Sequence, residues 1–194
     1  MLKPRIRIDT SRADVVWRFY RVLRKYGLNT ICELDRCPNL YECWLEGSIT
    51  FAIMGRVCTR ACPFCPIPRG KKGEPLDATE PERLAKAVRE LGLHHVVVSS
   101  VTRDDLPDGG ASHFAAVVRA IRKLSPGTVI EVLIPDLGGN RDSLKVVVDS
   151  RPDIIGHNIE TVKRLHGRIK PGGGYELSLR ICLLYTSPSP RDRG

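Results

Sequence analysis

The segment CTRACPFC, from Cys58 to Cys65, carries three cysteines separated by three and then two residues. A disulfide needs an even number of thiols, and a structural zinc ion takes four ligands. A cubane iron–sulfur cluster instead places thiolates on separate irons, and spacings of two to five residues let one segment reach several corners. Three thiolates leave one iron open to a substrate or a distant residue. Cys58, Cys62 and Cys65, named here the loop cysteines, are therefore candidate iron ligands.

A second group of three precedes the first. Cys32, Cys37 and Cys43, named here the upstream cysteines, lie in CELDRCPNLYEC at spacings of four and five residues. Neither group is built from two close pairs, and no well-spaced His completes either one, as a zinc site would require. The sequence therefore favours two iron–sulfur clusters, and a zinc-binding module is the alternative.

Hydrophobic periodicity predicts the scaffold for these residues. An amphipathic helix is expected over residues 12–26, followed by a cysteine-bearing loop. Strands and helices then alternate about four times, which favours parallel βα units with helices covering a sheet. The expected strands are 49–54, 94–101, 128–136 and 153–159, and the expected helices are 80–91, 111–124 and 141–150, with a fourth helix beginning near residue 174.

Polar residues gather after each expected strand. The loops beyond the carboxyl ends of parallel strands meet at one edge of the sheet and form its ligand site. The loop cysteines follow the first strand. The later strands are followed or ended by Ser99, Ser100, Thr102, Arg103, Asp104 and Asp105, by Pro135 and Asp136, and by His157, Asn158 and Glu160.

Composition limits the class of protein. The 194 residues are 42% hydrophobic and 27% charged, which is typical of one folded core. We expect no membrane association and a cytoplasmic location, because no apolar run could span a bilayer and the N-terminus lacks a signal-peptide pattern. In the reducing cytoplasm, clustered thiols are metal ligands or catalytic groups more often than disulfides. The formal charge of +9 fits a solvated surface or steering of an acidic partner. No nucleic-acid partner is expected, because no such binding motif is present.

The motif C-x3-C-x2-C after the first strand resembles the radical S-adenosylmethionine (SAM) superfamily, in which the open iron chelates the methionine moiety of SAM. The upstream C-x4-C-x5-C narrows the resemblance to the lipoyl synthase family. CPNLYECW, SSVTRDDLPDGGASHF, VLIPDLGG and HNIETVKRL are also similar to that family, and the resemblance runs from about residue 15 to about residue 180. It implies an α/β fold, a partial (β/α) TIM-like barrel. About four βα units over residues 49–180 would follow an N-terminal extension over residues 1–48.

The resemblance also implies a reaction. A radical SAM sulfurtransferase would insert two sulfur atoms at C6 and C8 of an octanoyl chain on a lysine of a lipoyl carrier domain. The loop cysteines would hold a 4Fe–4S cluster that cleaves SAM to methionine and a 5′-deoxyadenosyl radical. The upstream cysteines would hold an auxiliary 4Fe–4S cluster that is consumed as sulfur donor. The implied partners are a dehydrogenase-complex E2 subunit or the glycine-cleavage H protein, and an electron donor such as ferredoxin or flavodoxin.

Five polar residues are candidates for binding SAM. Ser100, Asp104 and Asp105 resemble the family's cosubstrate loop, and their oxygens can accept hydrogen bonds from the methionine ammonium or the ribose hydroxyls. Asn158 and Glu160 are comparable candidates. The alternative is that the two aspartates belong to a solvated turn and that Asn158 is the N-cap of the next helix. Both interpretations stay open at this point.

The end of the chain departs from the family. From about residue 181, ICLLYTSPSPRDRG shows no helical period and resembles unrelated sequence, so Cys182 is not expected to be a ligand. The family continues further and supplies a serine, in an Arg-Ser-Ser-like motif, to the auxiliary cluster. No such motif is present. We therefore expect a chain truncated at its C-terminus, with a tail over residues 181–194, an unpaired outer edge on the fourth strand and low activity. A naturally short homologue is the alternative.

A different radical SAM enzyme is the second alternative, because it would share the first-strand loop. Unchanged iron content after mutation of the upstream cysteines would favour it. Binding of zinc in place of iron and sulfide would favour the zinc-binding module.

Overall fold

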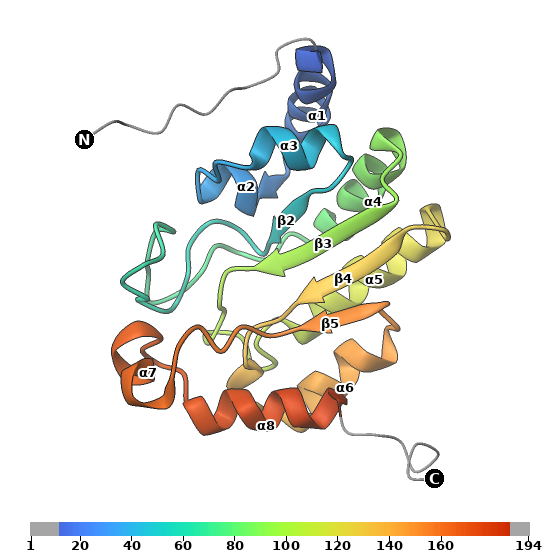
Figure 1. Cartoon of the computed structure of the whole chain (residues 1–194). Helices are drawn as coiled ribbons and strands as arrows, with labels where there is room; N and C mark the ends of the chain where they lie inside the picture. The colour runs from blue at the N-terminus through green and yellow to red at the C-terminus, as the bar shows by residue number, and fades with distance from the viewer. Residues whose placement is uncertain (1–11, 187–194) are drawn as a thin grey trace, which may run out of the picture.

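The computed structural model describes residues 12–186. Its centre is a five-stranded sheet with the order β1-β2-β3-β4-β5 (Figure 1). Strand β1 is antiparallel to β2, and β2 to β5 are parallel to one another, as predicted. The short β1 was not predicted, because two residues cannot show a period. The strand bounds are Asn29–Thr30, Thr50–Ile53, His95–Ser100, Val129–Leu133 and Ile154–Gly156.

Three helices connect the parallel strands and pack beside one another in chain order (Figure 1). They are α4 (Glu80–Leu91), α5 (Ala111–Leu124) and α6 (Arg141–Asp149), and all three confirm the predicted ranges to within one residue. Helix α4 carries Pro81 in its first turn and ends at Gly92, whose φ of 69° is left-handed. These are the start and stop signals that the sequence offered.

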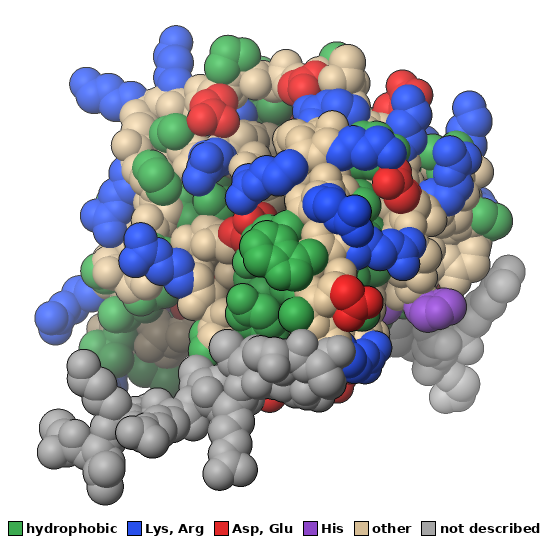
Figure 2. Space-filling view, turned by 90° about the horizontal axis from the view of Figure 1, so that it is seen from above, with side chains coloured by type: hydrophobic (Ala, Val, Ile, Leu, Met, Phe, Trp, Pro, Cys, Tyr) green, Lys and Arg blue, Asp and Glu red, His purple; other side chains and the backbone are tan. Residues whose placement is uncertain are grey.

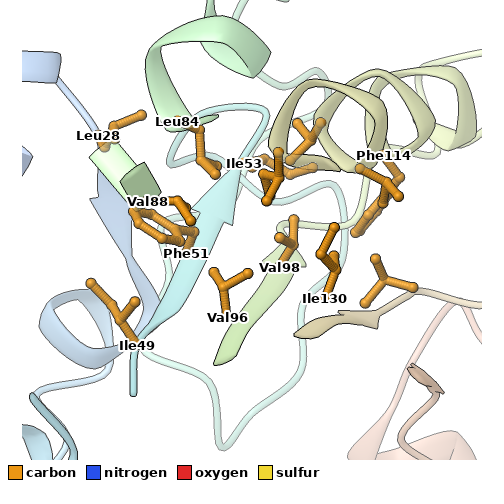
Figure 3. Packing of buried hydrophobic residues seen from close by; sticks show 14 of the residues in the cluster. Leu28, Ile49, Phe51, Ile53, Leu84, Val88, Val96, Val98, Phe114 and Ile130 are labelled. Atoms are coloured by element: carbon orange, nitrogen blue, oxygen red, sulfur yellow. The ribbon is translucent and has the colours of Figure 1, made fainter. Parts of the chain in front are cut away.

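The core lies between the sheet and these helices. Alternate strand residues, Phe51 and Ile53 on β2 and Val96 and Val98 on β3, meet apolar side chains of the helices (Figure 3). All four are fully buried. The intervening Val97 and the residues beside it on β4 are half-buried, so the second face of the sheet is less covered. This is the arrangement expected of the inner face of a partial barrel.

The N-terminal segment is more helical than predicted. Helix α1 (Ala13–Tyr26) is confirmed, but the expected cysteine loop contains α2 (Ile31–Leu34) and α3 (Leu40–Leu45). Trp44 on α3 is fully buried and stacks on Phe19 of α1, with ring centroids 5.3 Å apart. Helices of four and six residues are too short to show an amphipathic period, which explains the omission.

At the other end, η2 (Leu137–Gly139) follows β4, and α7 (Lys163–Ile169) and α8 (Tyr175–Thr186) follow β5. Helix α8 continues past the expected boundary at residue 181, and Ile181 is fully buried. The remaining tail residues 187–194 lie outside the described residues. Among the described strands, β5 pairs only with β4, so its outer edge is unpaired as expected. No helix within residues 12–186 is long and apolar enough to cross a membrane.

Candidate iron–sulfur site

The exit from β2 is fixed in a strained conformation. Met54 has a φ of 67°, which residues other than glycine rarely adopt. Its N–H donates to Oε2 of Glu80 at 2.9 Å, and its carbonyl accepts from Nη1 of Arg103 at 3.2 Å. Such strain persists only where the surroundings over-determine it, and it concentrates at functional sites.

The following loop folds back on itself at Cys58. The N–H of Cys58 donates to the carbonyl of Pro68 at 2.9 Å, and the N–H of Gly70 donates to the carbonyl of Cys58 at 3.0 Å. A Cβ at Gly70 would lie 2.7 Å from Cγ1 of Val57 and 3.0 Å from the carbonyl of Lys72, so a larger residue there would have to displace its neighbours. These hydrogen bonds between Cys58 and residues 68–70 close a short loop that contains all three loop cysteines.

The thiols of the loop cysteines share one environment. All three are unpaired and half-buried. Burial raises the pKa of Cys62, and the neighbouring thiols of Cys58 and Cys65 raise it further. The backbone N–H of Arg60 donates to Sγ of Cys58 at 3.4 Å. Metal ligands must be deprotonated, so a bound positive centre would stabilise thiolates that burial alone disfavours.

The upstream cysteines form a comparable group on α2 and α3. Oγ1 of Thr30 accepts the N–H of Glu33 at 3.1 Å and begins α2, and the pairing of β1 with β2 holds this turn beside the sheet. Burial raises the pKa of Cys43, and the thiols of Cys32 and Cys37 raise it further. These three thiols therefore also lie within electrostatic range of one another.

The two cysteine segments are neighbours. Burial raises the pKa of Cys65, and the carboxylate of Asp35, from the upstream segment, adds to that effect. A cavity of about 390 Å³ lies between the segments. The upstream segment contributes Thr30, Glu33, Leu34 and Arg36 to its lining, and the loop after β2 contributes Arg56 and Pro68.

The donor set fits iron–sulfur clusters. Within residues 12–186, no three Cys, His, Asp or Glu side chains converge as the ligands of one metal ion would. In a cubane each thiolate binds a different iron, so the sulfur ligands need not surround one point. Two separate groups of three thiols match this requirement, and each group would leave a corner open.

Arg60 ties the strand ends together from within the loop cysteines. Its side chain is 5% exposed and pairs with the fully buried Asp136 at 2.5 Å and with Asp104 at 2.8 Å. Burial lowers the pKa of Arg60, but its hydrogen bonds with Asp136 and Asp104 outweigh this and raise it. Burial raises the pKa of Asp136, but the pair with Arg60 lowers it overall. One guanidinium thus joins the loops after β2, β3 and β4.

The expected cosubstrate loop lies at the same edge of the sheet. Oγ of Ser100, the last residue of β3, is buried without a hydrogen-bond partner among the described residues. Asp104 pairs with Arg60, and Asp105 pairs with Arg103 through bonds of 2.8 and 2.9 Å. The alternative of a solvated turn is wrong for Asp105, whose side chain is only 11% exposed. Ser100 is therefore the candidate in this loop with an unused polar group.

The residues directly after β5 do not begin a helix. Helix α7 begins only at Lys163, so Asn158 is not its N-cap, and that interpretation is wrong. The carbonyl of Asn158 instead accepts from Nζ of Lys170 at 2.7 Å. Glu160 has a φ of 72°. Its charge is among the causes that raise the pKa of Cys62, which places it near the loop cysteines.

Sequence reasoning missed two cations at this edge, Arg60 and Lys170. Lys170 is buried, and its Nζ lies 3.2 Å from Nε2 of His157 and 3.4 Å from Oγ of Ser178. Burial lowers the pKa of Lys170. The sequence did carry a signal for Arg60. It lies between Cys58 and Cys62, and aspartates that could pair with it follow the next two strands. Nothing in the local sequence indicated that Lys170 would be buried.

Comparison with known proteins agrees with this geometry. The family model described as the radical SAM superfamily matches residues 52–187, a range that includes the loop cysteines. Methylornithine synthase has a similar structure, with a TM-score of 0.55 and 13% sequence identity over 87% of this chain and 52% of that one. At this identity the likeness shows the fold alone.

Curated relatives are similar over most of this chain. A lipoyl synthase of Methanocella arvoryzae is 49% identical over 91% of this chain and 60% of its own length. Those of Symbiobacterium thermophilum and Caldanaerobacter subterraneus are 50% and 51% identical, over 93% and 84% of this chain. The chain spans about 55–60% of the length of these three relatives. With its sheet, its loop cysteines and the matched range, the chain belongs to the radical SAM superfamily and is similar to the lipoyl synthases within it.

Proposed function

We propose that the protein carrying this chain is a lipoyl synthase. It would replace two C–H bonds, at C6 and C8 of an octanoyl chain on a carrier lysine, with C–S bonds. The observation that supports this most is the second group of thiols. Membership of the superfamily accounts for the loop cysteines but not for the upstream cysteines, whose segment lines one cavity together with the loop after β2.

The chain's own residues have distinct roles in this proposal. The loop cysteines hold the 4Fe–4S cluster, and Ser100 offers its unused hydroxyl to SAM. When bound, this cluster supplies the electron for the reductive cleavage of SAM. The upstream cysteines hold an auxiliary 4Fe–4S cluster that supplies sulfur. Asp104, Asp105, Asn158 and Glu160 remain candidates for binding SAM. Both oxygens of each aspartate already accept from an arginine, so either one would bind SAM through its second lone pairs or after exchange of the arginine.

The proposed partner is an octanoylated carrier domain, of an E2 subunit or an H protein, together with a ferredoxin or flavodoxin. Figure 2, which views the molecule from above, shows Lys and Arg side chains spread over this face. Helix α1 contributes the exposed Arg18, Arg21, Arg24 and Lys25. Such a surface would steer an acidic carrier by long-range attraction. The cytoplasmic location stays a prediction.

An anaerobic assay tests the proposal. The chain, and a version extended to the length of its relatives, are reconstituted and incubated with SAM, a reductant and an octanoylated carrier. Replacing the upstream cysteines with Ala should preserve formation of 5′-deoxyadenosine and abolish lipoyl formation. Replacing the loop cysteines should abolish both. Cys182→Ala is the matched control and should change neither. Lipoyl formation without the upstream cysteines would contradict the proposal.

A further inference from the structure

We propose that Arg60 is a positioning residue that holds the loop cysteines against the ends of β3 and β4 before any cluster binds. The long segment between β2 and α4 carries all three loop cysteines, yet it has almost no regular structure. Between Gly55 and Thr79, Arg60 is the only buried residue. Arg60 is thus the one buried side chain of the segment, here called its anchor, and it is two residues from Cys58 and from Cys62. The adjacent Thr59 adds a contact with the end of β3, because its N–H and Oγ1 both donate to the carbonyl of Thr102 at 3.0 Å.

The anchor makes two forked contacts. Its Nη1 and Nη2 reach both carboxylate oxygens of Asp136, at 2.5 and 2.7 Å, and its Nε and Nη2 reach both oxygens of Asp104, at 2.8 Å each. A planar guanidinium can satisfy two carboxylates in this way, whereas an ammonium group presents a single charged point. Lysine at this position would keep the charge and lose the geometry.

The backbone of Arg60 links the anchor to a sulfur ligand. Its N–H donates to Sγ of Cys58, so the fixed side chain also fixes the direction of that hydrogen bond. Hydrogen bonds to cluster sulfurs are among the features that tune iron–sulfur sites, and partners behind the direct ligands orient them. Arg60 would therefore act on the cluster through Cys58 without binding iron itself.

The turn between α7 and α8 covers the anchor from the other side. A Cβ at Gly173 would lie 3.1 Å from Oδ2 of Asp136 and 3.2 Å from Nη1 of Arg60. These distances are tighter than ordinary contacts, so an alanine there would push on the ion pair. A Cβ at Gly127 would have no such neighbour within 4 Å, so Gly127 offers a matched substitution away from the anchor.

Hydrogen exchange on the cluster-free chain, read by mass spectrometry, tests the proposal. In Arg60→Lys, amides of residues 57–70 should exchange about tenfold faster, while amides of α5 stay within about twofold. Gly173→Ala should accelerate the same amides by about threefold, and Gly127→Ala should leave them unchanged. If Arg60→Lys fails to fold, Asp104→Asn weakens the contact of Arg60 with position 104 and leaves the buried pair with Asp136. Exchange of residues 57–70 should then be faster than in the unchanged chain but slower than expected for Arg60→Lys.

Two outcomes would overturn the proposal. Unchanged exchange in residues 57–70 would mean that Arg60 does not hold the loop. A parallel increase in the loop and in α5 would mean that Arg60 only stabilises the fold. The exchange readout needs no bound cluster, so it stands apart from the proposed function. In the reconstituted chain, Arg60→Lys should also lose iron to a chelator faster than Gly127→Ala, and equal rates would count against the proposal.

Discussion

Asp136→Asn is the substitution whose energetic effect follows most directly from the structure. It removes the charge that lies against the buried Arg60, and the two side chains are 0% and 5% exposed. Removing one member of a buried ion pair costs about 3–5 kcal/mol, because the remaining charge is left uncompensated. Asp104 stays in place at 2.8 Å, but its side chain is 43% exposed. We therefore expect the low end of this range, a loss of about 3 kcal/mol in the free energy of unfolding.

Urea unfolding followed by circular dichroism measures this loss. Asn keeps an oxygen that can accept the N–H of Gly138, as Oδ1 of Asp136 does at 3.1 Å, so the cap of η2 should survive. The matched control is Asp149→Asn. It breaks an exposed pair with Lys145, whose side chain is 69% exposed, and should cost about 0.5 kcal/mol or less. A loss below about 1 kcal/mol for Asp136→Asn would refute the reasoning, because an exposed pair would explain it equally well.

Three further predictions concern pH, packing and docking. Burial lowers the pKa of His157 and of His166 below the usual 6.5, so the unfolded chain binds these protons more readily than the folded one. The midpoint of thermal unfolding should therefore fall as the pH drops below about 6.5. When both histidines are replaced with Gln, the midpoint should depend less on pH. An identical dependence on pH would contradict this. In urea unfolding, Gly70→Ala should destabilise the chain by about 1–3 kcal/mol through its contact with Val57. Adding Val57→Ala should restore part of this loss, and no restoration would contradict the reasoning. Binding of the octanoylated carrier should weaken as salt rises in a titration, and an unchanged affinity would exclude electrostatic steering.

Much of the fold was accessible from the sequence because its signals are periodic. The strands around Phe51 and Val98 are short apolar runs, and α4 between them has Pro81 in its first turn and ends at Gly92. The short α2 and α3, the two-residue β1 and the extension of α8 to Thr186 were not predicted, because tertiary contacts rather than local pattern stabilise them. Buried Trp44 makes such contacts for α3 and buried Ile181 for α8, and β1 is held by its pairing with β2.

For the candidate site too, local features could be predicted and contacts between distant residues could not. Spacing alone indicated both groups of cysteines as candidate ligands, because the members of each group lie close together in the sequence. The partners of Asp104 and Asp136 could not be found locally, because Arg60 is 44 residues from Asp104 and 76 from Asp136. The expectation for Asn158 as an N-cap was wrong because the chain continues without helix to Lys163. Polar residues at strand ends indicated where the site lies, but not which of them are already paired.

The most direct test of the account is the iron content of the anaerobically reconstituted chain. If each group of cysteines holds a 4Fe–4S cluster, analysis should find about eight irons and eight sulfides per chain. Replacing either the upstream cysteines or the loop cysteines with Ala should reduce both to about four. An iron content that does not change when the upstream cysteines are replaced, or zinc bound in place of iron and sulfide, would contradict the account.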